Sequence, residues 1–357
     1  FSSKQSMENS LGIHNQYGPV RGFDTMIVAS HDLIPETGHY TQWLKRHHPQ
    51  YIEEFYDLLD FSGPHTVMNV NGGGDTDAPF VAVNNTPKEL YHTDWVADHT
   101  IRWIDSMDPE DDWYCWMSFP DPHHPYDPPA SETHRVDWRD IDVDELYGES
   151  DAQRAGWLDA KPKHWKWWWT GEKFVSFEAM EGYGYQELLD NPDKIREINA
   201  MIHIENSIMD DAIGRVLDHL EAKGWLEDTD IIFTPDHGGL DGDNGLLLIG
   251  PALVDSVTRC TLAWKPAASR GVAPADVTAP VGLMDIPATI CQVAGVDVPD
   301  WMEGRPLPVS EEDAAAQGRD HVFTQYESYT PEAQIKMNAV YADGWICNVY
   351  ERTETYE

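Results

Sequence analysis

The chain has few cysteines, few basic residues and no long apolar run. Its 357 residues include four cysteines, none of them in a Cys-x-x-Cys pair, which excludes a zinc knuckle or a thioredoxin-type motif. Lysine and arginine together number 24, against 63 aspartates and glutamates, so the formal net charge is −39. So few cations leave no basic patch for nucleic acid and disfavour an anionic membrane surface. No stretch is apolar for the length that a bilayer span requires. We expect neither nucleic acid nor a membrane as a partner.

The remaining composition is that of a folded chain. Hydrophobic residues make up 41% and include 15 tryptophans, enough to build a core. The acidic excess indicates either a surface adapted to high salt or ordinary acidity taken to an extreme. Cys115 and Cys347 lie in apolar runs and are predicted to be buried, inert thiols. Oligomeric state and compartment stay open, with a cytoplasmic location slightly favoured.

Short apolar runs alternate with amphipathic segments along the chain. Trp113–Phe119 and residues 230–234 have the continuous apolar character of buried parallel strands, and a further strand is expected at 261–264. The clearest helix spans 191–224, where apolar residues recur every three or four positions. Other helices are expected at 40–59, 94–107 and 286–293. This alternation predicts an α/β fold with a mostly parallel sheet.

Residues 130–190 are expected to form an insertion. The segment contains a cluster of aromatic residues, Trp165–Trp169. Such a cluster can line a substrate entrance, but packing over the core is the more common use. We therefore predict that these tryptophans pack.

Two loops carry the residues suited to chemistry, and each follows a predicted parallel strand. The first loop contains His123 and His124, and the second contains Asp236 and His237. The carboxyl ends of strands are where ligands bind in open α/β sheets. A carboxylate oxygen and an imidazole nitrogen suit a divalent metal, although two adjacent residues cannot complete its coordination sphere. A polar turn after a strand is the alternative interpretation of the second loop.

The order of these features resembles the sulfatase family of the alkaline phosphatase-like superfamily, near arylsulfatases and phosphonate monoester hydrolases. Pro122–Tyr126 matches the family's Pro-His-x-Pro-Tyr/Phe segment, and Phe233–Gly238 matches its Phe-Thr-x-Asp-His/Asn-Gly signature. Between them lies a family-type helix, Ile204–Leu217. Further matches are Arg21–Asp24, Gly242–Leu247, Asp255–Arg259, Val281–Ile286 and Trp301–Gly304. The resemblance implies a single domain over residues 1–357, with a mostly parallel central sheet and helices on both faces.

The resemblance also implies a function, namely metal-dependent hydrolysis of small-molecule sulfate or phosphate esters. Asp236 and His237 would bind the divalent metal, Ca²⁺ in the first place, with Mn²⁺ or Mg²⁺ as alternatives. His123 would contact the ester or protonate the leaving oxygen. His124 occupies the variable position of the motif and is a secondary candidate for substrate binding. Sulfate esters are the leading substrates, but Asp-His-Gly in place of Asp-Asn-Gly leaves phosphonate monoesters and phosphodiesters as the alternative.

The chain departs from the family pattern in three places. The family nucleophile, a formylglycine made within C/S-x-P-x-R, has no counterpart here, and neither has the early aspartate pair. Both are expected in a segment before Phe1. The position of an ester-binding lysine is Ile249, for which Lys265 is the candidate replacement. The chain stops at Glu357, before the family's usual C-terminal segment. We expect the 357-residue chain not to turn over an ester, and an inactive pseudoenzyme is a further alternative.

Overall fold

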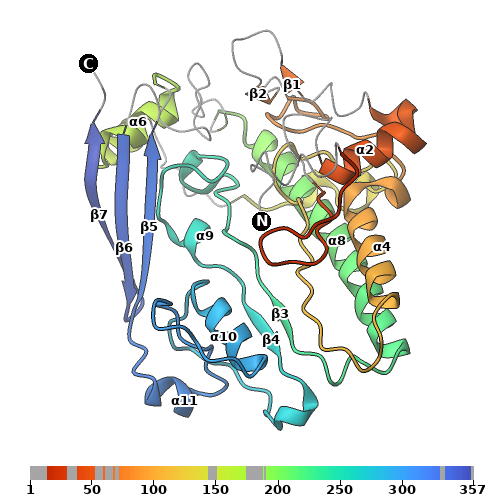
Figure 1. Cartoon of the computed structure of the whole chain (residues 1–357). Helices are drawn as coiled ribbons and strands as arrows, with labels where there is room; N and C mark the ends of the chain where they lie inside the picture. Colours follow the sequence, from red (N-terminus) through yellow and green to blue (C-terminus); the bar gives the residue numbers. More distant parts are fainter. Residues whose placement is uncertain are drawn as a thin grey trace. The chain divides into compact units, whose positions relative to one another are not determined.

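The computed structural model of the chain describes residues 14–29, 38–52, 59–60, 67–68, 72–143, 151–173, 188, 190–329 and 334–354 (Figure 1). The chain divides into two compact units. The first comprises Phe1–Val143 and Asn191–Gly224, and the second comprises Asp144–Asp190 and Trp225–Glu357. In the described part, no helix is both long enough and apolar enough to span a bilayer. The single-domain organisation and the insertion at 130–190 stay predictions.

The first unit is organised around the 31-residue helix α8 (Pro192–Ala222), which runs beside α4 (His92–Asp105) (Figure 1). Pro192 is tolerated at the start of α8, because the N–H that proline lacks would have no helical partner in the first turn. Polar contacts join the two helices, with Arg215 Nη1 3.5 Å from Asp94 and His219 Nε2 2.8 Å from Asp105. The predicted helices at 191–224 and 94–107 are thereby confirmed.

The hydrophobic core of the first unit lies between α4 and α2 (Gly38–His47). Its buried members are Tyr40, Leu44, Ile52, Trp95 and Val96, and Met117 and Phe119 pack against them. The helix expected at 40–59 ends early, because the residue before a proline disfavours helical geometry and proline follows at position 49. The remaining short elements of this unit are β1 (Leu59–Asp60), β2 (Val67–Met68) and the 3₁₀ turns Pro49–Tyr51, Lys88–Leu90, Thr133–Arg135 and Trp138–Asp140.

In its described residues, the second unit contains two antiparallel sheets. The larger comprises β5 (Val322–Tyr329), β6 (Gln334–Ala342) and β7 (Trp345–Glu354), and β3 (Ile231–Phe233) pairs with β4 (Ala263–Lys265) in the other. Asp343 and Gly344 join β6 to β7, and both have positive φ, as a two-residue hairpin turn of type I′ requires. The described helices of this unit are α5 (Asp151–Asp159), α6 (Lys163–Thr170), α9 (Asp255–Thr258), α10 (Asp285–Val293) and α11 (Glu311–Ala316), with 3₁₀ turns at Asp243–Gly245 and Ala268–Arg270.

The predicted parallel sheet is not found among the described residues. Strands form at two of the predicted positions, as β3 and β4, but they pair antiparallel. The only parallel pairs in the described ranges are isolated bridges, Val81 with Tyr126 and Asn84 with Pro129. Residues 113–119 are extended without a ladder in the described part, and alternate side chains such as Tyr114 and Trp116 are about half exposed. The prediction of a fully buried strand there is wrong, because only one face of the segment packs.

Two predictions about side-chain burial had opposite outcomes. Trp165 and Trp168 of α6 are each 1% exposed, which confirms that these tryptophans pack. Cys347 is exposed, so the prediction of a buried thiol there is wrong. It lies on β7 opposite Val340, which is also exposed, so that face of the sheet is uncovered in the described part. Cys115 is half-buried, and burial raises the pKa of its thiol to about 11, as an unreactive cysteine requires.

Candidate functional site

His123 and His124 lie in the first unit, in the proline-rich loop that follows the extended segment 113–119. Backbone hydrogen bonds connect the end of this loop to residues 80–82. Tyr126 N donates to Phe80 O over 2.8 Å, and Ala82 N donates to Tyr126 O over 3.0 Å. These bonds fix the loop by its main chain and leave its two histidines to be oriented by their own contacts.

The ring of His123 is oriented by the backbone of the next residue. Its Nδ1 lies 2.5 Å from the carbonyl oxygen of His124, and the two rings stack with centroids 4.1 Å apart. A carbonyl only accepts, so Nδ1 carries the proton and the neutral ring presents Nε2 as an acceptor. His124 is 4% exposed and packs against Phe80, whereas His123 is half-buried. His123 is therefore the better placed of the two to reach a substrate.

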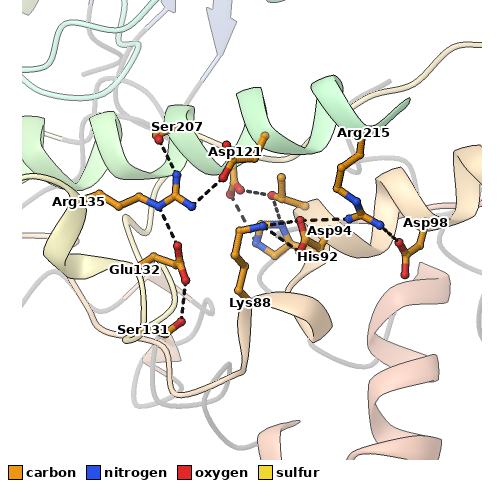
Figure 2. Close-up of polar contacts among 12 residues, drawn as sticks. Lys88, His92, Asp94, Asp98, Asp121, Ser131, Glu132, Arg135, Ser207 and Arg215 are labelled. Carbon is orange, nitrogen blue, oxygen red and sulfur yellow. Dashed lines mark hydrogen bonds and ion pairs between the residues drawn. The ribbon is translucent and has the colours of Figure 1, made fainter. Parts of the chain in front are cut away.

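Buried aspartates stand at both ends of the histidine loop, and Asp121 stands before it. Asp121 accepts a hydrogen bond from Thr93 Oγ1, and its Oδ1 lies 3.5 Å from His92 Nε2 (Figure 2). The hydroxyl of Tyr91 donates to the same Oδ1 over 3.4 Å. Tyr91 is the N-cap of α4, and the other two residues lie in its first turn. The start of α4 therefore holds the entry to the loop.

Asp127 stands after the loop and connects it to α8. Its Oδ2 accepts from Asn84 Nδ2 over 2.9 Å, and its backbone N donates to Glu205 Oε1 over 2.8 Å. Glu205 is fully buried. Burial raises the pKa of the Glu205 carboxyl well above its usual range, and the negative charges of Asp121 and Asp127 raise it further. Two helices and three buried carboxyl groups therefore support the loop.

The segment after the loop is tied to α8 by Arg135. Its Nε donates to Glu132, its Nη1 to Ser207 Oγ and its Nη2 to Asp211, each over 2.7 Å (Figure 2). Ser207 and Asp211 are one turn apart on α8. A single guanidinium therefore joins a surface turn to the helix that also holds Asp127.

The three buried carboxyl groups are not among the residues predicted from the sequence, although one signal for them is present. Glu205 occupies the position between Ile202 and Met209 at which the apolar repeat of the helix calls for an apolar residue. A carboxyl group in such a stripe requires a partner, because burying it unpaired is costly. Asp121 and Asp127 carry no comparable signal, since a polar loop is the ordinary place for an aspartate.

Asp236 and His237 lie in the second unit, in the turn after β3. His237 Nδ1 lies 3.0 Å from the carbonyl oxygen of Gly238, so Nδ1 carries the proton and Nε2 presents its lone pair. That Nε2 lies 3.6 Å from Asp236 Oδ2. The side chain of Asp236 is 76% exposed and that of His237 is 39% exposed. The two donor atoms are therefore close together and accessible.

Gly238 holds this turn against α9. Its N donates to Val257 O over 2.8 Å. A Cβ at this position would lie 1.9 Å from the carbonyl oxygen of Ser256, closer than any side chain can approach. The glycine of the Asp-His-Gly sequence is thus required by the close approach of two backbones, and it places the preceding pair at the edge of the unit.

The donor set of Asp236 and His237 fits a divalent cation as two of its ligands. An oxygen and a neutral imidazole nitrogen are the donors that borderline divalent metals accept. Among the described residues, no group of three or more His, Cys, Asp or Glu side chains is placed to hold a metal. The pair alone does not complete a coordination sphere.

Ile249 stands at the position of the family's ester-binding lysine, and Lys265 is the candidate replacement. Both residues lie in the second unit. Lys265 Nζ donates to the carbonyl oxygens of Leu226, over 2.7 Å, and Thr229, over 3.2 Å. Ile249 is half-buried and precedes Gly250, on which the ring of Trp168 lies so closely that a Cβ would meet it at 1.8 Å. A substrate-binding role for Lys265 stays a prediction.

Comparison with known proteins gives a consistent family. The Sulfatase family model matches residues 8–296. An arylsulfatase of Clostridium perfringens is 24% identical over 244 residues, which is 67% of this chain and 46% of that protein. A choline-sulfatase of Rhizobium meliloti is 25% identical over 256 residues, 67% of this chain and 43% of that protein. The chain thus spans less than half of the length of these two relatives.

A solved structure has a similar fold. The phosphonate monoester hydrolase SpPMH from Silicibacter pomeroyi superposes with a TM-score of 0.66 over 94% of this chain and 65% of that one. At 19% sequence identity, this likeness shows the fold alone. It supports the α/β, alkaline phosphatase-like architecture, although the described residues contain only small antiparallel sheets.

Proposed function

Because the chain belongs to the Sulfatase family, we propose that it serves the metal-dependent hydrolysis of small-molecule sulfate esters. One observation carries the proposal: the rings of His123 and His237 are oriented by the same type of hydrogen bond. In each ring, Nδ1 is hydrogen-bonded to the carbonyl oxygen of the following residue, so Nε2 is the nitrogen that would act on a ligand. The two sequence relatives named as an arylsulfatase and a choline-sulfatase support sulfate esters as the substrate class.

The residues divide the work according to their chemistry. Asp236 and His237 would hold the divalent metal, whose positive charge neutralises the anionic ester. His123 in its protonated form would donate a proton from Nε2 to the leaving oxygen, and the His124 carbonyl would keep the ring in place. Long-range attraction does not help, since a net charge of −39 repels an anion. The attraction that binds the anionic ester must therefore come from groups held close to it in the site.

Two alternatives have observations in their favour. Phosphonate monoester or phosphodiester hydrolysis is favoured by the Asp-His-Gly form of the signature and agrees with the fold likeness to SpPMH. An inactive relative is favoured by Ile249, since an apolar side chain cannot stabilise the charge of a transition state. Both alternatives are outcomes of the same experiment.

The test is the rate of hydrolysis of a matched aryl sulfate and aryl phosphonate by the product of the complete open reading frame, with and without Ca²⁺ or Mn²⁺. We expect metal-dependent hydrolysis with a preference for the sulfate, and no turnover by the 357-residue chain alone. His123→Ala should lower kcat roughly 10²–10⁴-fold, the usual contribution of a general acid. Asp236→Asn should raise the metal concentration required for activity.

His134→Ala is the matched control, because His134 is exposed and its Nδ1 also contacts a backbone carbonyl, that of Ser131. It should leave the rate unchanged. A preference for the phosphonate would establish the first alternative. Absence of any metal-dependent hydrolysis in the complete product would establish the inactive relative.

A further inference from the structure

Three carboxyl groups are buried together beneath the histidine loop. Asp121 is 6% exposed, and Asp127 and Glu205 are 0% exposed. The two aspartates belong to the loop, and Glu205 belongs to α8. The other titratable groups that face the cluster are His92, Tyr91 and Tyr40, and burial first, then the carboxyl charges, raise the pKa of both tyrosines. Neither tyrosine brings positive charge to offset the carboxylates.

The three carboxyl groups differ in the donors that reach them. Asp121 lies near His92 (Figure 2). It also receives the hydroxyls of Thr93 and Tyr91. Asp127 receives the side-chain amide of Asn84. Glu205 receives one backbone N–H on Oε1, whereas its Oε2 is buried with no hydrogen-bond partner among the described residues. Of the three, Glu205 is the one least able to carry a negative charge.

Electrostatics then decides which group is neutral. Three negative charges in one buried space repel each other, and each loses its hydration. A proton settles on Glu205, because its Oε2 is buried with no donor among the described residues, and protonation there removes the charge from that oxygen. Protonation at Oε2 leaves Oε1 as the acceptor for Asp127 N–H, so the observed hydrogen bond is kept.

We propose that Glu205 holds a proton in the folded protein and that this neutral carboxyl fixes the loop that presents His123. Glu205 is in this sense a positioning residue, which acts through Asp127 and does not touch the substrate. Loss of the proton would place a third negative charge between the aspartates at the two ends of the loop and push both ends away. The value of this positioning for catalysis rests on the proposed function of His123, but the protonation itself does not.

Glu197 provides a matched control on the same helix. It is 1% exposed, and both of its oxygens accept hydrogen bonds. Oε1 accepts from Asp75 N over 2.6 Å, and Oε2 accepts from Thr76 N over 2.8 Å and from Thr76 Oγ1 over 2.5 Å. Glu197→Gln would turn an NH₂ group toward the donors that Glu197 now accepts from, whereas Glu205→Gln would replace a protonated oxygen by an NH₂ group.

The first measurement is thermal unfolding of the 357-residue chain between pH 4.5 and 9. A raised pKa means that the folded state binds a proton that the unfolded state has lost, so Glu205 makes stability fall as pH rises from about 4.5 toward its folded pKa. Glu205→Gln removes this loss. Its melting temperature relative to that of the wild type should therefore climb by about 3–5 °C between pH 5 and 8. Glu197→Gln should melt lower than the wild type at every pH.

The second measurement reads the position of His123 by NMR of histidine labelled with ¹³C and ¹⁵N, assigned with His123→Gln. The Nδ1-protonated signature of His123 should persist in Glu205→Gln and be lost in Glu205→Ala. In the wild type it should also be lost as pH rises, while Glu205→Gln keeps it to a higher pH. Neither readout needs turnover, so a failure of the ester assay leaves this result intact.

Each outcome decides the proposal. A pH profile of Glu205→Gln parallel to that of the wild type would overturn it, because Glu205 would then be ionised in the folded state. So would an effect of Glu205→Gln as large as that of Glu197→Gln at all pH values. An unchanged His123 signature in Glu205→Ala would show that Glu205 does not position the loop.

Discussion

At the scale of single residues, His164 shows how this protein tolerates a buried imidazole. Its Nε2 donates to the carbonyl oxygen of Pro251 over 3.0 Å, and its Nδ1 is buried with no hydrogen-bond partner among the described residues. Burial lowers the pKa of His164 to about 4, and the bond to Pro251 opposes this shift only in part. The ring must therefore be neutral, since a proton on Nδ1 would be left without an acceptor.

The neutral His164 predicts a loss of stability in acid. The unfolded chain binds a proton near pH 6.5 and the folded chain near pH 4, so stability is complete above pH 6.5 and falls as pH drops toward 4. The loss is at most about 3 kcal/mol, from 1.36 kcal/mol for each pKa unit. His164→Gln keeps a donor for Pro251 and should flatten the acid side of a plot of unfolding free energy against pH. His134→Gln, at an exposed histidine, should reproduce the slope of the wild type, and an equally steep slope in His164→Gln would contradict the assignment.

At the scale of elements, α8 connects most of the first unit. Successive turns of this one helix contact the turn at residues 75–76 through Glu197, the histidine loop through Glu205, Arg135 through Asp211, and α4 through Arg215. Each contact is polar and lies beside the apolar face of the helix. The long helix thereby fixes the register of segments that are distant in the sequence.

In the second unit, Asp285 has a similar connecting role at the start of α10. Its Oδ1 accepts from Arg305 N over 2.8 Å, and its Oδ2 accepts from Arg319 Nη1 over 2.7 Å. The Asp285 and Arg319 side chains are 7% and 2% exposed. Asp285→Ala would leave the guanidinium of Arg319 buried without its carboxylate, and we expect a loss of about 3–5 kcal/mol in unfolding free energy.

Urea unfolding followed by tryptophan fluorescence measures this loss. Asp255→Ala is the control, because Asp255 also begins a helix but pairs with Arg259 over 3.4 Å on the surface, at 61% and 76% side-chain exposure. An exposed pair and a charge in the first helical turn each contribute less than about 1 kcal/mol. Equal losses in the two variants would show that the Asp285–Arg319 pair adds nothing.

The elements also show what could be predicted from the sequence. The α8 helix was predictable because its apolar repeat is local and long. The residues of β3 and β4 were recognised as strands, but the direction of their pairing depends on partners that no local pattern names. Motif order predicted His123, Asp236 and His237 as site residues, and their roles stay predictions. The hydrogen bond from Asp127 to Glu205 joins residues 78 apart, so the support of the loop could be found only in the folded chain.

At the scale of the whole molecule, the net charge of −39 determines the response to salt. Self-repulsion among the carboxylates opposes the compact state, and dissolved ions shorten its range from about 10 Å at 0.1 M to about 3 Å at 1 M. The exposed ion pairs, such as Arg139 with Asp75, weaken under the same screening but contribute little. With 63 acidic against 24 basic residues, relief of repulsion should outweigh their loss.

We therefore expect the melting temperature to rise by several degrees between 0.05 and 1 M NaCl. Sucrose is the control, because it favours compact states by exclusion from the surface and screens no charge.

The shape of the curve of melting temperature against salt concentration separates the two interpretations of the acidic composition. A rise that levels off once the screening length falls below the spacing of the carboxylates indicates simple relief of repulsion. A rise that continues into molar salt, beyond the gain that sucrose produces, indicates a surface adapted to high salt, and a flat or falling curve would mean that the net charge does not limit the stability of this fold.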